Sequence, residues 1–284
     1  LKNIFTHPPI NEIPHYSLNP REKWLKHFDK TGFSFNPDSL VSLSYYGSFC
    51  RGIATGANEF FVLTRSQSGS IRVRDHELLP CITKSAQIRK PVFSKDDFEN
   101  MASADAPVFL LNANGQLSSG VSEYIKVGMS QGFNLRYLTK VRNPWYRVES
   151  RSPAPLLFGV FSRQGYKIIR NFSDAVNLTC YHGFQPNLFG AQLVDHLFLY
   201  LMSKVGRTIL SQNMRKYGDS LDKFEPNDLN KSLVPSMELF SSIDLQRIKE
   251  EMRHVSVQGT LSPDGERIFE DLLPSCLDLK RDWK

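Results

Sequence analysis

This 284-residue sequence lacks the signatures of several common enzyme and membrane-protein classes. It contains no P-loop, no HExxH, no GxSxG, and no Gly-rich turn that joins a strand to a helix. Its longest apolar run, LFLYLM at 197–202, is far shorter than the roughly 20 residues that a membrane-spanning helix needs. We therefore predict no membrane association, no catalytic site and no metal site in this chain.

Cysteine is also scarce. The four cysteines are far apart in the sequence and form no CxxC pair, which argues against a zinc site built on cysteine pairs and against a disulfide framework. They are Cys50, Cys81, Cys180 and Cys276. A reducing, cytoplasmic location is the expectation. The chain begins with Leu1 and not with Met, as expected for a piece of a longer or processed protein.

Positive charge is present and unevenly distributed. The whole chain carries a net charge of +6, and residues 136–170 contain eight basic residues and one acid, Glu149. The eight are Arg136, Lys140, Arg142, Arg147, Arg151, Arg163, Lys167 and Arg170. Such a concentration is typical of a surface that binds a polyanion, above all nucleic acid. The alternative is a solvated basic face without a specific partner.

Hydrophobic patterning predicts an α+β fold with a mixed, largely antiparallel sheet core. The predicted strands are 39–54, 59–65, 68–82 (with a loop), 107–113, 156–163, 166–173 and 175–186. The predicted helices are 19–28, 121–133, a long buried helix over 191–217, a turn of helix within 225–235 before a strand, and 242–255. Gly56 and Asn58 are predicted to form a turn between two core strands.

Four segments, in this order, resemble one protein family. They are RGIATGANEFFVL (51–63), YLTKVRNPWYRVESRSPAPLLFGVFSR (137–163), YKIIRNFSDAVNLTCYHGFQP (166–186) and LFLYLMSKVGRTILSQNMRKYGDSLDKFEPNDLNKSLVP (197–235). Together they are similar to the C-terminal target recognition domain of γ-class adenine-N6 DNA methyltransferases of restriction–modification systems. The Taq-type enzymes and the type I specificity subunits end their recognition domains in a similar way. The resemblance covers roughly residues 40–236.

The resemblance implies a division of the chain and of the reaction. Residues 1–38 would join a missing catalytic domain, 39–236 would be the DNA target recognition domain, and 237–284 a helical extension. The family's S-adenosylmethionine site is not in this sequence, which has no Gly-rich turn between a strand and a helix. Its Asn/Asp-Pro-Pro-Tyr/Phe motif is also missing, because NPWY at 143–146 has a tryptophan in place of the second proline. Methyl transfer would then belong to an S-adenosylmethionine-dependent domain or subunit, and whether this chain is an enzyme by itself stays open.

Double-stranded DNA is the partner that the resemblance implies, and twelve residues are candidates to contact it. They are Arg51, Thr55, Asn58, Lys140, Arg142, Trp145, Tyr146, Arg163, Lys167, Arg170, Lys216 and Lys223. The cations suit phosphates or base edges, and the aromatic pair suits stacking on a displaced base. Each has a structural alternative: a surface ion pair for the cations, the core for the aromatic pair, and a turn for Thr55 and Asn58.

Two rival functions remain open at this point. A type I-like specificity subunit would work with separate methyltransferase subunits, but a single recognition unit without a long coiled-coil spacer argues against it. A nuclease or an RNA-binding module with an unrecognised site is the second rival. Magnesium-dependent cleavage would identify a nuclease, and a preference for single strands would identify an RNA-binding module.

Overall fold

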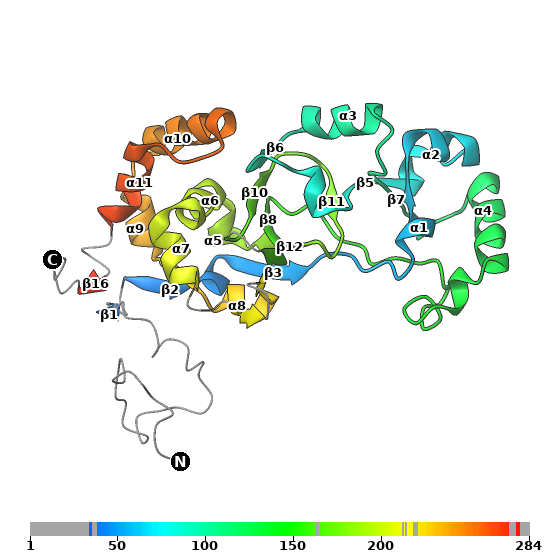
Figure 1. Cartoon of the computed structure of the whole chain (residues 1–284), viewed down its shortest axis with the longest axis horizontal. Helices are drawn as coiled ribbons and strands as arrows, with labels where there is room; N and C mark the ends of the chain where they lie inside the picture. Colours follow the sequence, from blue (N-terminus) through cyan, green and yellow to red (C-terminus); the bar gives the residue numbers. More distant parts are fainter. Residues whose placement is uncertain are drawn as a thin grey trace, which may run out of the picture.

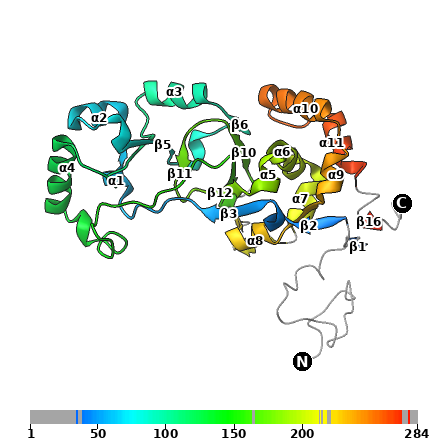
Figure 2. The same ribbon diagram turned by 180° about the vertical axis from the view of Figure 1, so that it is seen from behind.

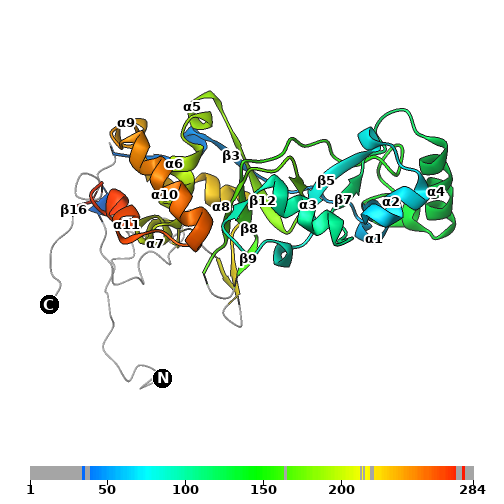
Figure 3. The same cartoon turned by 90° about the horizontal axis from the view of Figure 1, so that it is seen from above.

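The computed structural model describes residues 34–35, 39–162, 165–211, 213, 215–217, 221–272 and 277–278. The described chain is elongated (Figure 1), with helix α4 (Ser119–Ser130) at one end and helix α11 (Pro263–Glu270) at the other. A five-stranded sheet lies between the two ends, as the view from behind also shows (Figure 2). Seen from above, α3 (Lys95–Ser103) lies over the middle of the molecule (Figure 3).

The central sheet has the strand order β3-β12-β8-β10-β6. Its strands are β3 (Gly47–Arg51), β12 (Tyr181–Pro186), β8 (Leu156–Gly159), β10 (Ile168–Asn171) and β6 (Val92–Phe93). Neighbours are antiparallel except β10 and β6, which are parallel. Successive side chains of a strand point to opposite faces, so Leu156 and Phe158 join one core cluster and Leu157 another. Both faces of this sheet are therefore covered.

One face of the central sheet packs against the C-terminal helices. They are α5 (Leu188–Ala191), α6 (Val194–Met202), α7 (Lys204–Ser211), α8 (Pro226–Asn230), α9 (Met237–Ser241), α10 (Leu245–Gln258) and α11. Helix α6 contacts β10 and α10, and Leu197, Phe198 and Leu199 on it are fully buried. No helix among the described residues is long and apolar enough to cross a membrane.

A second sheet builds the other lobe, with the strand order β11-β5-β7-β4. Its strands are β11 (Val176–Asn177), β5 (Leu78–Ile82), β7 (Phe109–Leu111) and β4 (Val62–Leu63). Helices α1 (Asn58–Phe61), α2 (Arg65–Ile71) and α4 lie around it (Figure 1). Phe60 and Phe61 of α1 are buried in its core together with Val121 and Ile125 of α4.

Three small ladders complete the fold. Strand β2 (Leu40–Ser42) pairs with β15 (Leu233–Pro235), and β1 (Ser34–Phe35) pairs with β16 (Leu277–Asp278), both antiparallel. Strand β14 (Leu221–Lys223) lies between β13 (Arg215–Tyr217) and β9 (Phe161–Ser162). The architecture confirms the predicted α+β class with mixed, largely antiparallel sheets.

The prediction of one long helix over 191–217 is wrong, because the structure has two shorter helices there. Helix α6 ends at Met202 and α7 begins at Lys204, with Ser203 extended between them at ψ 156°. The Oγ of Ser203 accepts a hydrogen bond from the amide of Gly206 at 3.1 Å, which starts the new helix as an N-terminal cap does. A Cβ on Gly206 would lie 2.0 Å from the Tyr200 carbonyl oxygen. The helical spacing of apolar residues continues across Ser203, so the pattern of the sequence does not reveal the break.

Two other predicted strands are partly helical. Residues 58–61 form α1, so the strand predicted over 59–65 is reduced to β4. Residues 65–71 form α2 because Thr64 and Gln67 make a reciprocal capping box at its start, a local signal that promotes helix. The strands over 107–113 and 156–173 and the helix over 121–133 are confirmed by β7, β8, β10 and α4. The helix over 19–28 lies outside the described residues.

Candidate nucleic-acid interface

The turn after β3 is built around one glycine and one buried threonine. Gly56 has a φ of +80°, a conformation that glycine adopts at little cost. The Oγ1 of Thr55 donates to Oδ1 of Asn58 and accepts from the amide of Ala57 at 3.1 Å. Thr55 is 1% exposed, whereas Asn58 is exposed at the start of α1. Gly56 forms the predicted turn, and Asn58 begins a helix.

Residues 133–148, which we call the anchored loop, pack on this turn. A Cβ on Gly56 would lie 2.7 Å from Cβ of Leu138. The Arg142 guanidinium donates to the carbonyls of Thr55 at 2.7 Å and Ala54 at 2.5 Å. Burial lowers the pKa of Arg142 from its ordinary value, although an arginine keeps its charge at neutral pH. The guanidinium therefore fastens the loop to the turn.

The aromatic pair of the anchored loop belongs to the lobe's core. The Trp145 ring lies 5.1 Å from the Phe60 ring and 6.2 Å from the Phe61 ring, measured between centroids. Tyr146 packs against the same core cluster and makes an edge contact with Trp145 at 5.9 Å. Both side chains are half-buried. Their contacts match the structural alternative, and stacking on a base stays a prediction.

The outer side of the anchored loop is basic. Its 16 residues contain four basic residues and no acid. Lys140 and Arg147 are exposed, and neither has an acidic partner among the residues that the structure describes. Arg136 pairs with Glu59 of α1 at 2.6 Å. A loop with unpaired cations and no carboxylate of its own suits a negatively charged ligand.

Glu149, directly after the loop, holds two arginines. It pairs with Arg51 at the end of β3 at 2.9 Å and with Arg151 at 3.0 Å. The Arg51 side chain is 54% exposed. Exposed ion pairs contribute only about 0–1 kcal/mol, so a phosphate can replace the carboxylate at small cost. A phosphate contact by Arg51 stays a prediction.

The candidates on β10 and beside it are engaged inside the fold. The Lys167 Nζ donates to the carbonyls of Ser85 at 2.9 Å and of Ile88, and burial lowers the pKa of Lys167. Arg170 pairs with Asp195 at 2.6 Å, and its side chain is 13% exposed. These two cations contact their own chain, and a DNA contact by either stays a prediction.

Two candidates lie on the small β9–β14–β13 ladder. Lys223 on β14 pairs with Glu225 at 2.6 Å and lies 5.4 Å from the centroid of the Phe161 ring. Lys216 lies on β13 opposite Asp222, and its side chain is outside what the structure describes. Arg163 lies outside the described residues. The anchored loop and this ladder come from different parts of the elongated molecule (Figure 3).

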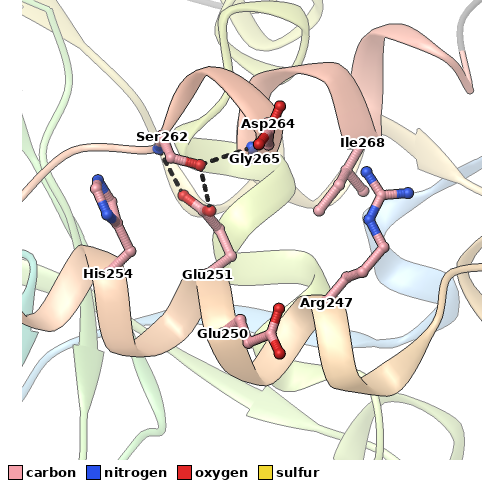
Figure 4. Close-up of a pocket in the computed structure, with 8 residues that line it drawn as sticks. All are labelled: Arg247, Glu250, Glu251, His254, Ser262, Asp264, Gly265 and Ile268. Atoms are coloured by element: carbon pink, nitrogen blue, oxygen red, sulfur yellow. Dashed lines mark hydrogen bonds between the residues drawn. The ribbon is translucent and has the colours of Figure 1, made fainter.

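A pocket of about 390 Å³ lies between α10 and α11 (Figure 4). The Glu251 carboxylate accepts from the amide of Ser262 at 2.7 Å and from its hydroxyl at 2.6 Å. A Cβ on Gly265 would lie 2.2 Å from the Glu251 carboxyl carbon. A carboxylate of the chain itself therefore occupies the start of α11, and its contacts are structural. Among the described residues, no group of three His, Cys, Asp or Glu side chains could hold a metal ion.

By fold and site, this is an α+β chain of two joined lobes, one of which presents a basic loop fastened to a buried turn. The chain belongs to the family described as the C-terminal domain of the type II methyltransferase M.Eco57I, whose model matches residues 35–269. The family match confirms the resemblance at the level of a methyltransferase C-terminal domain.

Individual relatives agree with this family. The type II methyltransferase M.AccI of Acinetobacter calcoaceticus is 35% identical over 96% of this chain and 53% of its own length. The type II methyltransferase M.XamI of Xanthomonas campestris pv. amaranthicola is 24% identical over 66% of this chain and 35% of its own length. The chain thus spans about half of the first and a third of the second. The solved structure of the type IIG restriction endonuclease BpuSI aligns with 84% of this chain and 31% of that chain, at 15% identity and a TM-score of 0.49.

Several residues that are exposed on the anchored loop were not predicted as DNA contacts from the sequence. Arg147 and the exposed Leu135, Tyr137 and Val141 of the anchored loop are not among the twelve DNA contacts predicted from the sequence. The available signal was the stretch FNLRYLTKVRNPWYRV (133–148), which has apolar and basic residues and no acid. Its apolar residues look like core residues, and only the fold separates the exposed ones from Leu138.

Proposed function

We propose that this chain recognises a site on double-stranded DNA for a restriction–modification methyltransferase that acts on the N6 amine of adenine. The observation that carries the proposal is the anchored loop, which is acid-free, basic and fixed to the Thr55 turn by Arg142. Membership of a methyltransferase C-terminal family supports DNA as the ligand of this basic surface.

The proposed contacts form two layers. The exposed Lys140, Arg147 and Arg51 bind phosphates and set the position of the chain on the duplex. Asn58, an exposed residue at the start of α1, is our candidate for a contact to a base edge: its Nδ2 can donate to adenine, and Oδ1 has a second lone pair besides the one that accepts from Thr55. Arg142 serves these contacts by holding the loop on the turn.

S-adenosylmethionine is proposed to bind outside this chain. A cofactor of this kind needs an open Gly-rich turn followed by a helix whose amides point to the ligand. The turn at Gly56 does not fit, because Leu138 fills the space beside it and Arg142 occupies the carbonyls of Ala54 and Thr55. The helix that follows, α1, has four residues. Methyl transfer is thus assigned to a domain or subunit with the catalytic motif.

The test is the salt dependence of duplex binding by paired variants. The Lys140→Ala, Arg147→Ala double variant should bind all duplexes more weakly, and the slope of log Kd against log salt should fall by about two. Lys249→Ala, Arg253→Ala is the matched control, because both residues are exposed on α10 at the other end of the molecule (Figure 1). Equal effects of the two double variants would contradict a specific interface on the anchored loop.

The same assay separates the rival functions. Stronger binding to single-stranded RNA than to duplex DNA would favour an RNA-binding module. Cleavage of the duplex on addition of magnesium would favour a nuclease. Duplex binding that needs a separate methyltransferase subunit would favour a type I-like specificity subunit.

A further inference from the structure

The outer side of the anchored loop carries three exposed apolar side chains. Leu135 is 72% exposed, Tyr137 79% and Val141 74%. Apolar surface in water is unfavourable, by roughly 25 cal/mol for each Å² that a partner could cover. These three residues lie within seven positions of one loop, and we call them the apolar tip; exposed apolar side chains concentrated in one segment are a feature of binding surfaces.

The apolar tip stands on a rigid base. Thr139, which lies between Tyr137 and Val141, is 0% exposed, and its hydroxyl donates to the carbonyl of Phe133, with the carbonyl of Arg136 also within 3.2 Å. Arg142 and Leu138 fasten the same stretch to the turn at residues 54–56. The loop has therefore lost its conformational freedom on folding, and inserting its tip into a partner would cost little further entropy.

The charge around the tip identifies the kind of partner. Lys140 lies 5.8 Å from the centre of the Tyr137 ring, Arg147 is exposed near the end of the loop, and the loop contains no acid. Apolar side chains beside Lys140, which pairs with no acid among the described residues, match a duplex, in which stacked bases lie between two rows of phosphates, although Arg136 of the same stretch pairs with Glu59. Proteins that open a base step insert side chains of this kind from a groove, while neighbouring cations bind the phosphates.

We propose that Tyr137, flanked by Leu135 and Val141, inserts between bases of duplex DNA and opens one base step. This inference rests on the proposed function, and it assigns to Tyr137 the opening of the base stack at the recognised site. The phenol ring stacks on an exposed base face, and the two aliphatic side chains fill the widened step. Opening the stack lowers the cost of extruding a neighbouring base, which an enzyme that modifies a base in a duplex requires.

The experiment compares binding to intact duplexes and to duplexes from which one base has been removed. A gap in the stack spares the cost of opening it, so the wild-type chain should bind one of a series of single-gap duplexes about tenfold more tightly than the intact site. Tyr137→Ala should bind the intact site about tenfold more weakly and show a gap preference close to one. Thermal unfolding of Tyr137→Ala should be unchanged, because the side chain is exposed.

Two control variants distinguish the insertion of Tyr137 from other effects. One removes a positive charge of the loop, and the other removes an exposed apolar side chain elsewhere on the chain. Lys140→Ala should weaken binding to gapped and intact duplexes equally and keep the gap preference. Leu188→Ala removes a side chain that is 82% exposed on α5, away from the anchored loop (Figure 1), and should change neither value. Leu135→Ala, its counterpart on the loop, should lower the gap preference.

The outcomes are distinct. Duplex binding without a gap preference, or a preference that survives in Tyr137→Ala, would overturn insertion and leave DNA recognition intact. Failure to bind any duplex would overturn both. Concentration-dependent self-association that is lost in Tyr137→Ala would assign the apolar tip to a second copy of the chain, and would likewise overturn insertion.

Discussion

Replacing Arg142 with alanine should destabilise the protein, because this guanidinium is a structural tie between segments far apart in the chain. It donates to the carbonyls of Thr55 and Ala54, which lie 87 and 88 residues earlier. A hydrogen bond to a charged group contributes about 1.5–3 kcal/mol, so the two bonds together would contribute about 3–6 kcal/mol, and the partial exposure of Arg142 reduces that sum. We expect the free energy of unfolding to fall by about 2–3 kcal/mol and the melting temperature by about 5–10 °C.

Urea unfolding followed by tryptophan fluorescence would measure this, since Trp145 packs against the lobe that contains the tie. Arg142→Lys should recover only part of the loss, because an ammonium lacks the planar fork that reaches two carbonyls. Arg147→Ala is the control: it removes an exposed arginine of the same loop and should change stability by less than about 0.5 kcal/mol. Equal stabilities of Arg142→Ala and Arg147→Ala would refute the structural role and return Arg142 to direct DNA contact.

Gly265→Ala should cost about 2 kcal/mol in unfolding free energy, because its Cβ would meet the Glu251 carboxylate at 2.2 Å. Gly69→Ala in α2, where nothing lies within 4 Å of the added Cβ, should instead stabilise by about 0.5–1 kcal/mol; chemical denaturation of both variants tests the pair. Burial lowers the pKa of His196 below its ordinary value of 6.5, although Asp195 opposes the shift. The unfolded chain therefore binds the proton at higher pH than the folded chain does, and stability should fall as pH drops below about 6.5. His196→Leu should make that fall shallower but not abolish it, because burial lowers the pKa of His182 as well.

Much of the sheet architecture could be predicted from local patterns. The run at 107–113 starts with a proline, where a strand tolerates it, and ends in the polar residues 112–116. The strands predicted over 156–163 and 166–173 are neighbours in the central sheet, where β8 pairs antiparallel with β10, and Gly165 in the connection has a positive φ of 78°. These signals lie within a few residues of the structure they specify, which is why they are readable without the fold.

The errors have a common physical origin in local hydrogen bonds. Thr64 and Gln67 convert a β-like stretch into the start of α2, and Ser203 interrupts a helical apolar stripe by capping the next helix. A hydrophobic pattern reports which side chains are buried, and burial is compatible with either backbone conformation in a short segment. The capping residues carry the decisive information, and they are polar residues that a search for apolar periodicity passes over.

The sequence predicts the region of the candidate interface, but it does not predict which of its cations are at the surface and which pair inside the fold. The charge count located 136–170, but the partners of its cations lie far away in sequence: Arg170 meets Asp195, and Lys167 meets carbonyls more than 70 residues earlier. Tyr137 and Leu138 are adjacent and both apolar, yet one is 79% exposed and the other packs against Gly56. Which cations remain at the surface is decided by tertiary contacts, and single-sequence reasoning cannot see them.

Selection of binders from a random duplex DNA library by the whole chain, at two salt concentrations, would show whether this chain recognises a DNA sequence. We expect enrichment of one short motif, with affinity that falls by roughly 10–100-fold between about 50 and 200 mM salt, as three phosphate contacts would give. Salt-sensitive binding without an enriched motif would restrict the chain to the phosphate backbone. Absence of binding at both salt concentrations would contradict the proposal that this domain carries DNA recognition.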